Sequence, residues 1–400
     1  MFIKIKIMKV AILTSGGLAP CLSAAVGYLI QRYHLLDPKI EIIAYRYGYQ
    51  GLLLGQSTVL SDYSEAPSLL NFGGSPIGNS RVKLSNASDC EKKGLIASGA
   101  NPFEVAAQQL ITDHVDVLHT IGGDDTSTTA AELAHFLKQH NYPLTIVGLP
   151  KTIDNDINPI QLSLGATTAA EQGAIFFEHV VNEHTANPKT LVVHEVMGRH
   201  CGWLTYETAR QYTERLQRRT FAPHLGFLKE AFEIHALYIP EIDIQLDAEI
   251  ARLQPKLDHI GSLNIFVSEG ACANVIVQEL EHSGQAIERD AFGHVKLDKI
   301  NAGQWIGERL AKRLGAKKLL VQKSGYFARS SQPNAFDLNL IQAYVDYAVE
   351  CAFNQQSGLI GQDERFGGQL RCIEFEAISG GKPLKLKDPA IHNLLKVINS

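Results

Sequence analysis

The sequence lacks the glycine patterns that identify the common nucleotide-binding folds. It contains no GxxxxGK[ST] loop, and no two of its glycines are separated by a single residue. These absences exclude the P-loop and the dinucleotide-binding fingerprint. Cysteine is scarce as well, with six residues scattered over 400 positions and no CxxC pair. This spacing excludes a zinc ribbon or a disulfide framework and predicts a reducing compartment.

Long apolar runs and strong net charge are also missing. No segment approaches the roughly 20 apolar residues of a membrane span, and lysines interrupt the apolar N-terminal stretch MFIKIKIMKVAILTSGG. We therefore expect a soluble cytoplasmic protein without a signal peptide. The formal net charge is only −5, which argues against nucleic acid or an anionic membrane as a partner.

What the sequence does contain is an alternation of strand-like apolar runs and helical patterns. Such alternation predicts βαβ units with largely parallel sheets. At 400 residues the chain is long enough for two hydrophobic cores, so we expect two domains. The expected strands are 9–14, 39–47, 115–122, 144–150, 190–196, 264–270 and 317–325, and the clearest helices are 128–140, 167–184 and 302–315.

Two corners rich in glycine follow expected strands, TSGG at 14–17 and IGGDDTSTT at 121–129. A helix that begins after such a corner offers free N–H groups and a positive dipole end to a phosphate. Each corner could equally be an ordinary turn, and Asp124 and Asp125 could simply cap a helix. A carboxylate beside a phosphate site is, however, also how proteins hold Mg²⁺ against phosphate oxygens.

A third corner places a cation next to carboxylates. PKTIDNDI (150–157) follows the apolar stretch TIVGLP (145–150), which is typical of a buried strand closed by proline. Polar residues at the end of a parallel strand are where open α/β sheets bind ligands. Lys151, Asp154 and a metal at the GGDD corner would supply the cation, the proton acceptor and the metal that phosphoryl transfer to a hydroxyl requires.

Short motifs in a fixed order make the sequence resemble the phosphofructokinase family from Gly16 to Arg329. Each motif alone is weak, since Met197 could be a core residue and Glu269 a helix-start carboxylate, but the ordered set is specific. One departure is LAPCLS (18–23), where the family commonly has DAPGxN. The motifs are TSGG (14–17), GGSPIGNSR (73–81), GGDD (122–125), TIDND (152–156), MGRHCGWLT (197–205), VSEGA (267–271) and GYFARS (325–330).

The resemblance implies an α/β fold of two Rossmann-like three-layer domains with largely parallel sheets and the active site in the cleft between them. The expected divisions are 1–165 for the phosphoryl donor, 166–336 for the sugar phosphate, and 337–400 returning to the first domain. The resemblance further implies transfer of a phosphoryl group to the 1-hydroxyl of fructose 6-phosphate, with Mg²⁺ as the cofactor. A homo-oligomer is expected, with a homodimer favoured over a homotetramer.

The resemblance also assigns roles on the donor side. Asp124 would bind Mg²⁺, Asp154 would take the proton from the sugar's 1-hydroxyl, and Asp156 would hold the catalytic loop. The remaining donor-side residues would contact the substrates, chiefly their phosphates: Gly17, Arg81, Thr152 and Ile153.

On the acceptor side, Arg199 would line the sugar site and also neutralise the moving phosphoryl group, and Glu269 would accept hydrogen bonds from sugar hydroxyls. The forked guanidinium of Arg329 would suit the 6-phosphate. Lys189 would supply further positive charge, across a subunit interface, because Leu338 stands where ATP-using members often carry arginine. The other acceptor residues are Met197, Gly198, Tyr326, Phe327 and Ala328.

Two positions separate the branches of the family by donor. ATP-using members usually have glycine where this sequence has Asp125 and Lys151, whereas members that resemble it use inorganic pyrophosphate. Asp125 would put negative charge where a nucleotide's α-phosphate must lie, and Lys151 would stabilise pyrophosphate and its leaving phosphate. The alternatives are an ATP-dependent enzyme and a non-catalytic sugar-phosphate sensor; the presence of Asp124 and Asp154 argues against the sensor.

Overall fold

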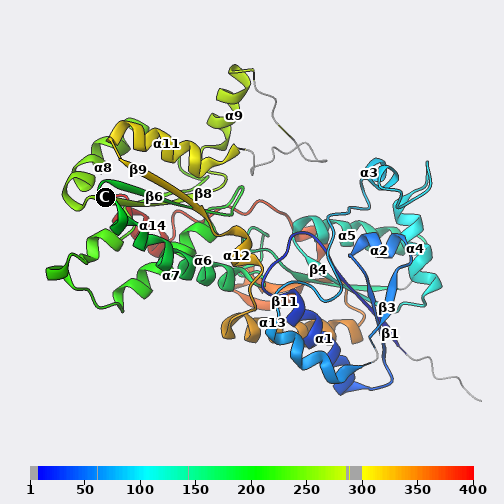
Figure 1. The fold of residues 1–400 in the computed structure, drawn as a ribbon. Helices are drawn as coiled ribbons and strands as arrows, with labels where there is room; N and C mark the ends of the chain where they lie inside the picture. The colour runs from blue at the N-terminus through cyan, green and yellow to red at the C-terminus, as the bar shows by residue number, and fades with distance from the viewer. Residues whose placement is uncertain (1–7, 61, 143, 285–287, 289–299) are drawn as a thin grey trace, which may run out of the picture. The chain divides into compact units, whose positions relative to one another are not determined.

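The protein consists of two compact α/β units, seen in a computed structural model (Figure 1). The first unit is Met1–Thr168 with Arg329–Lys382, and the second is Ala169–Ala328 with Pro383–Ser400. No helix in the described part of the chain is long and apolar enough to span a membrane. The structure describes residues 8–60, 62–142, 144–284, 288 and 300–400.

This division differs from the expected one at the C-terminus. We expected residues 337–400 to return to the first unit, but only the part up to Lys382 lies there. The rest belongs to the second unit, because Leu384, Leu395 and Ile398 are buried in that unit's hydrophobic core.

A seven-stranded sheet forms the centre of the first unit, in the order β11-β10-β5-β4-β1-β2-β3. Its inner strands are parallel, and only the edge strands β3 and β11 run antiparallel to their neighbours. Strands buried on both faces have nearly continuous apolar sequences, which is why most of them could be predicted. The strands are β1 (Lys9–Thr14), β2 (Glu41–Tyr45), β3 (Ser57–Val59), β4 (Val117–Gly122), β5 (Thr145–Pro150), β10 (Gly358–Asp363) and β11 (Gln369–Ile373).

Helices cover both faces of this sheet. Ala11 and Leu13 of β1 pack into one core with α2, α4 and α5, whereas α1 and α13 pack together on the opposite face (Figure 1). The helices of this unit are α1 (Leu22–Leu36), α2 (Tyr49–Leu53), α3 (Ala87–Lys92), α4 (Pro102–Thr112), α5 (Asp124–Gln139) and α13 (Ala335–Phe353).

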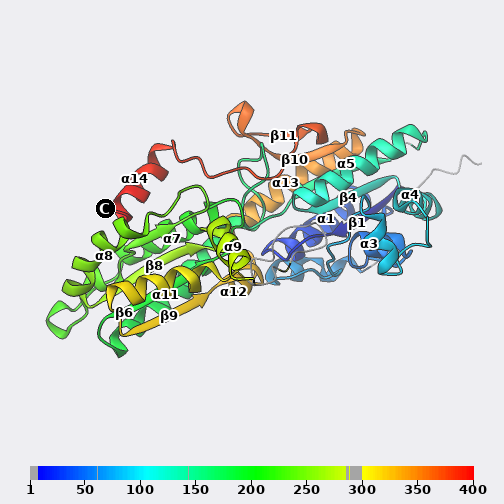
Figure 2. The same cartoon turned by 90° about the horizontal axis from the view of Figure 1, so that it is seen from above.

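The second unit has a four-stranded parallel sheet in the order β7-β8-β6-β9. Alternate residues of its strands serve two cores: Leu191 and Val193 of β6 face α8, α9 and α11, and Val192 faces α6, α7 and α14. This gives a second three-layer arrangement, with α7 and α14 on one side of the sheet and α11 on the other (Figure 2). The strands are β6 (Thr190–Val196), β7 (Ala236–Tyr238), β8 (Ser262–Ser268) and β9 (Lys318–Lys323).

The helices of the second unit include two at which the chain passes between the units, α6 and α12. Within the described residues these helices are α6 (Ala166–Val180), α7 (Trp203–Gln217), α8 (Leu246–Ile260), α9 (Ala273–His282), α11 (Ala302–Leu314), α12 (Gly325–Arg329) and α14 (Pro389–Ile398).

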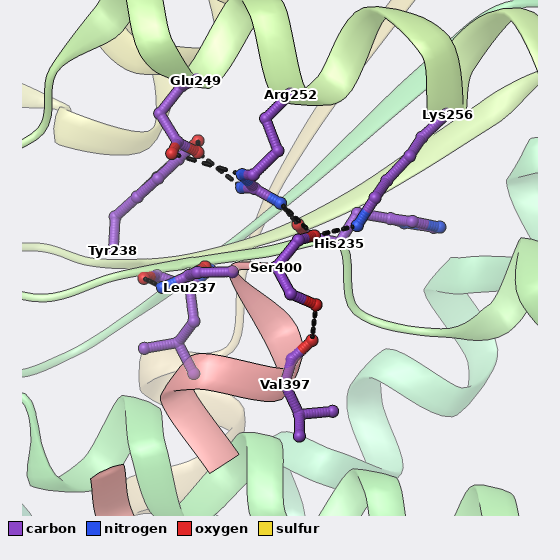
Figure 3. Close-up of polar contacts among 9 residues, drawn as sticks. His235, Leu237, Tyr238, Glu249, Arg252, Lys256, Val397 and Ser400 are labelled. Carbon is purple, nitrogen blue, oxygen red and sulfur yellow. Dashed lines mark hydrogen bonds and ion pairs between the residues drawn. The ribbon is translucent and has the colours of Figure 1, made fainter. Parts of the chain in front are cut away.

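Hydrogen bonds hold Asn399 and Ser400 against the rest of the second unit (Figure 3). The side-chain oxygen of Asn399 accepts a hydrogen bond from the backbone N–H of Leu237 at 2.9 Å. The carbonyl oxygen of Ser400 accepts from Lys256 Nζ at 2.6 Å and from Arg252 Nη1 at 3.4 Å. These bonds, together with the apolar face of α14, explain why this segment packs on the second unit.

The predicted alternation of strands and helices is confirmed, with differences at the ends of elements. Helix α5 begins at Asp124 rather than at 128, because the two aspartates form its first turn. Four strands were not predicted. Two of these, β3 and β7, are only three residues long. The other two, β10 and β11, are joined by a short connection and form an antiparallel pair.

Asp337 is a fully buried carboxylate that joins α13 to the start of α6. It accepts hydrogen bonds from the backbone N–H and the hydroxyl of Thr168, at 2.8 and 2.5 Å, and from the backbone N–H of Gly165 at 3.3 Å. A buried charge is tolerated only with such partners. Asp337 therefore ties the start of α13 to the start of α6 within the first unit.

Replacing Asp337 with asparagine should lower the free energy of unfolding by about 2–4 kcal/mol, because an amide group then faces donors that need an acceptor. Asp346→Asn is a matched control on the same helix, where an exposed ion pair with Arg32 at 3.1 Å is lost, and it should change stability by less than ~1 kcal/mol. Urea unfolding followed by circular dichroism measures both. Equal effects of the two substitutions would contradict this role for Asp337.

Candidate active site

The carboxyl ends of three neighbouring strands in the first unit carry three predicted corners. Strand β1 is followed by Gly16 and Gly17, β4 by Asp124, and β5 by Lys151. Because β5, β4 and β1 are adjacent and parallel, these corners lie side by side at one edge of the sheet. This is where open α/β sheets bind ligands.

Lys151 is a buried cation at which the three corners meet. Its side chain is confined, since the residue is only 3% exposed. Its backbone N–H donates to the carbonyl of Gly122 at 2.8 Å, and its ammonium group donates to the carbonyl of Gly17 at 2.5 Å. Gly16 has φ +84°, and a Cβ there would lie 3.2 Å from Lys151 Nζ, so both backbone and space favour glycine.

Burial lowers the pKa of Lys151 to about 8, because the ammonium form loses its hydration. The positive charges of Arg81 and Arg329 also lower this pKa, whereas the negative charge of the Asp124 carboxylate raises it. A bound anion would favour the ammonium form. The site is therefore suited to a small, highly charged anionic ligand.

The loop that follows Lys151 is held by its own hydrogen bonds. The hydroxyl of Thr152 donates to Asp156 Oδ1 at 3.0 Å and accepts from the backbone N–H of Asp154 at 3.2 Å. Asn155 is buried in a left-handed conformation, with φ +51°, and Ile153 is buried in the same turn. Asp154 is half-buried. The arrangement thus fixes the backbone of Asp154 through Thr152 and Asp156.

The GGDD corner holds a crowded carboxylate. The pKa of Asp124 is raised, first by burial and then by the charges of Asp125 and Asp156. A cation would relieve this crowding. The described residues contain no cluster of three or more side chains able to hold a metal ion, but Mg²⁺ commonly takes one or two carboxylates together with substrate phosphates. Asp124 therefore fits a metal held jointly with a phosphate ligand.

Asp125, which we expected to place negative charge at this corner, forms an ion pair. Its carboxylate lies 2.5 Å from Lys83 Nζ, and the two side chains are 60% and 20% exposed, respectively. Pairing weakens the negative potential at this position. Exclusion of a nucleotide by Asp125 would therefore depend on the space that the pair fills as well as on charge. Sequence reasoning missed Lys83, whose only signal was its place two residues after Arg81.

The loop that carries Arg81 is attached to the first corner. The side-chain amide of Asn79 donates to the carbonyls of Gly16 and Gly17, at 2.7 and 3.3 Å, and the backbone N–H of Gly16 donates to the carbonyl of Ser80 at 2.9 Å. Arg81 itself is exposed. Its Nη2 would lie 3.8 Å from a Cβ built on Gly17, so its guanidinium lies beside this corner.

A second group of predicted residues gathers at the carboxyl ends of β6, β8 and β9 in the second unit. The backbone N–H of Glu269 donates to Val196 at 2.8 Å, and the hydroxyl of Ser268 donates to the carbonyl of Gly198 at 2.6 Å. Gly325, after β9, packs on Met197, since a Cβ there would lie 3.0 Å from the sulfur. The structure thus brings together the segments 197–199, 269–270 and the start of α12.

Glu269 is the buried carboxylate of this group. Burial raises its pKa, and a hydrogen bond from the backbone N–H of Gly198 at 3.4 Å acts in the opposite direction. On the short helix α12, Tyr326 is 79% and Phe327 51% exposed, while Ala328 is buried. Arg329, at the end of this helix, belongs to the first unit.

Lys189 is not brought to this group within the chain. It precedes β6, whereas Met197 follows it, and seven strand residues span ~20 Å. Its ammonium group forms an exposed ion pair with Asp258 at 2.7 Å. Within one subunit Lys189 thus lies away from Met197, and its contribution of positive charge across a subunit interface stays a prediction.

The predicted site residues divide between the two units, and Lys189 lies apart from the others in its unit. The first unit holds Gly17, Arg81, Asp124, Asp125, Lys151, Thr152, Ile153, Asp154, Asp156 and Arg329, and the second holds Lys189, Met197, Gly198, Arg199, Glu269, Tyr326, Phe327 and Ala328.

Comparison with known proteins identifies one family and several relatives that this chain resembles. The family described as Phosphofructokinase matches residues 9–352. A protein of Methylotuvimicrobium alcaliphilum named pyrophosphate–fructose 6-phosphate 1-phosphotransferase is 57% identical, over 95% of this chain and 94% of its own length. A protein of the same name from Mastigamoeba balamuthi is 54% identical, over 97% and 95%. The crystal structure of pyrophosphate-dependent phosphofructokinase from Marinobacter aquaeolei has the same fold, with a TM-score of 0.72 at 19% identity, over 98% of this chain and 92% of that one.

The burial of Lys151 predicts a pH-dependent stability. Its native pKa of about 8 lies below the ordinary value of 10.5, which the unfolded chain should have. The penalty for burying the ammonium group is therefore complete below pH 8 and disappears by about pH 10.5. Relative to Lys151→Met, the wild type should gain up to ~3 kcal/mol of unfolding free energy between pH 7 and pH 10.5.

Urea unfolding of both proteins at several pH values measures this difference. Lys189→Met, which removes an exposed lysine, serves as the control, and its offset from the wild type should stay constant within ~1 kcal/mol. A constant offset for Lys151→Met as well would show that Lys151 has an ordinary pKa in the native state.

Proposed function

The chain belongs to the phosphofructokinase family, and we propose that it reversibly transfers a phosphoryl group from pyrophosphate to the 1-hydroxyl of fructose 6-phosphate. The products are fructose 1,6-bisphosphate and inorganic phosphate. The observation that carries the choice of donor is the buried ammonium group of Lys151 at the meeting point of three strand ends. The names of the relatives that are 54–57% identical support the same donor.

Lys151 is proposed to stabilise the phosphate that leaves when the donor is cleaved. A fixed cation in a site with little water stabilises developing charge far more than an exposed one does. Arg81, beside Gly17, would add positive charge to the donor phosphates. Pyrophosphate brings no adenosine to bind, so such charge–charge contacts have to supply most of its affinity.

Asp154 is proposed to accept the proton of the sugar's 1-hydroxyl as that oxygen attacks the donor phosphorus. In the reverse reaction the same carboxyl group returns the proton. The hydrogen bonds from Thr152 to Asp156 and from the Asp154 backbone to Thr152 hold this loop in one conformation. Such positioning contributes directly to the rate, because the acceptor must lie within hydrogen-bond reach.

Mg²⁺ belongs to the same proposal. Asp124 would hold the ion together with donor phosphate oxygens, in agreement with its crowding by Asp125 and Asp156. When bound, the ion neutralises charge on the transferring oxygens.

The group in the second unit is proposed to bind fructose 6-phosphate. Glu269 would accept hydrogen bonds from sugar hydroxyls, and Arg199 would neutralise the moving phosphoryl group. Tyr326 is largely exposed and would bind the 6-phosphate together with Arg329 of the first unit. The other members of this site are Met197, Gly198, Phe327 and Ala328.

A homo-oligomer, with a homodimer favoured, also belongs to the proposal, because Lys189 could act only on a neighbouring subunit's site. A cytoplasmic location belongs to it as well. None of the six cysteines is in a disulfide, which agrees with a reducing compartment.

Two other functions are less consistent with the site. An ATP-dependent enzyme would need room for a nucleotide where the Lys83–Asp125 pair lies. A sugar-phosphate sensor would need neither Asp124 as a metal ligand nor Asp154 as a base.

Initial rates of fructose 1,6-bisphosphate formation test the proposal, with pyrophosphate or ATP as the donor and Mg²⁺ present. The expected kcat/KM is at least ~100-fold higher for pyrophosphate, equivalent to ~2.7 kcal/mol of transition-state stabilisation. Asp154→Asn provides the control for contaminating activity and should lower kcat by ~10²–10⁴-fold. A wild-type preference for ATP would refute the donor, and sugar binding without turnover of either donor would favour the sensor.

A further inference from the structure

A segment near the C-terminal end of the first unit packs against the corners that carry the predicted catalytic residues. None of the family motifs includes this segment. It is Ile378–Lys382, with the sequence ISGGK, and it lies beyond the residues 9–352 that match the family. It follows the short 3₁₀ turn Phe375–Ala377, which packs against α5. Ala377 and Ile378 contact the hydrophobic core of the first unit, so the segment is anchored from its N-terminal side.

Backbone hydrogen bonds join this segment to the loop that carries Asp154. The backbone N–H of Asn158 donates to the carbonyl of Ser379 at 2.8 Å, and that of Ser379 donates back to Asn158 at 3.0 Å. The backbone N–H of Lys382 donates to the carbonyl of Asp156 at 2.9 Å. The segment therefore holds both the last residue of TIDND and the chain just after it.

The side chain of Lys382 holds the C-terminal end of this segment in place. It is only 9% exposed, and its ammonium group donates to the carbonyl of Ile160 at 2.5 Å and lies 3.7 Å from Glu364. A buried lysine must have such partners to offset its lost hydration. Gly380 and Gly381 therefore lie between two residues, Ser379 and Lys382, that hydrogen bonds hold in place.

Gly380 lies against the carboxylate of Asp124. A Cβ added to Gly380 would overlap Oδ2 of Asp124 and would lie 2.9 Å from its Cγ. The backbone of Gly380 is not in a left-handed conformation, so the need for glycine comes from this close approach alone. The main chain at 380 therefore occupies the space into which the Asp124 side chain could otherwise turn.

We propose that residues 378–382 are a positioning element of the donor site, which fixes the carboxylate of Asp124 and ties it to the loop of Asp154. This inference rests on the proposed function, because it names residues that act through the metal-binding and proton-accepting side chains. Asp124 and Asp156 carry like charges, which repel each other, and the backbone of residues 378–382 lies against the side chain of one and the main chain of the other. The segment contacts both: it packs on Asp124 and bonds to the backbone of Asp156.

Gly380→Ala tests this restraint. The added methyl group meets the end of a side chain, which can move, so the protein should still fold with Asp124 displaced. Residues that orient metal ligands typically change metal affinity or activity by ~10–100-fold, and the variant should lose that much Mn²⁺ affinity, measured by electron paramagnetic resonance with saturating inorganic phosphate and no sugar. The kcat with pyrophosphate should fall by a similar factor, about 10–100-fold, while the KM for fructose 6-phosphate stays within about twofold because the sugar residues are untouched.

Gly367→Ala is the matched control. Gly367 lies in the connection between β10 and β11 of the same unit, and nothing lies within 4 Å of a Cβ built there. Because its φ is +66°, this substitution should cost about 1 kcal/mol of stability without changing Mn²⁺ affinity or kcat. A loss of Mn²⁺ affinity in Gly380→Ala but not in Gly367→Ala therefore reports displacement of Asp124 rather than general destabilisation.

Lys382→Met is a second variant that removes the anchor without adding bulk near Asp124. It should lower kcat with pyrophosphate and weaken Mn²⁺ binding in the same direction, again without raising the KM for the sugar. Mn²⁺ affinity and kcat within twofold of the wild type in both variants would overturn the proposal, as would a selective rise in the sugar KM. Wild-type protein that uses only ATP would refute the proposed donor, whereas the Mn²⁺ measurements would still decide the role of this segment.

Discussion

The donor side of the site depends on one constraint, the burial of a lysine ammonium group at the ends of three parallel strands. Lys151 has almost no contact with solvent, and its ammonium group donates to the carbonyl of Gly17. A charge in such a place requires backbone acceptors and close packing, which glycines at the neighbouring corner allow. The same burial lowers the pKa of Lys151, and a bound phosphate would raise that pKa again because it favours the ammonium form.

The surrounding residues can be understood as a response to that constraint. The carboxylate of Asp124 favours the charged form of Lys151 but is itself repelled by Asp156, so the loops that carry the two carboxylates must be held. Hydrogen bonds within TIDND hold one loop, and the segment 378–382 links it to the other. The chain that returns to the first unit after α12 thus adds α13, β10 and β11 to that unit and also brings the segment 378–382 to this pair of carboxylates.

The sequence allowed most of the fold to be predicted, because strands buried on both faces of a parallel sheet are continuous apolar runs. Site residues at strand ends, such as Lys151 and Asp124, could be found for the same reason. Contacts between distant segments could not. Lys83 and Asp125 are 42 positions apart, and nothing in ISGGK indicates that Gly380 would lie against Asp124.

The most direct test of the buried lysine is a measurement of its own pKa. Heteronuclear NMR of protein with isotope-labelled lysine, with Lys151→Met to assign the signal, can follow Nζ as the pH rises. The account predicts a pKa of about 8 in the free protein and a clear increase when inorganic phosphate or pyrophosphate binds, because an adjacent anion favours the ammonium form. A pKa near 10.5 in the free protein, or one that does not change with either anion, would contradict it.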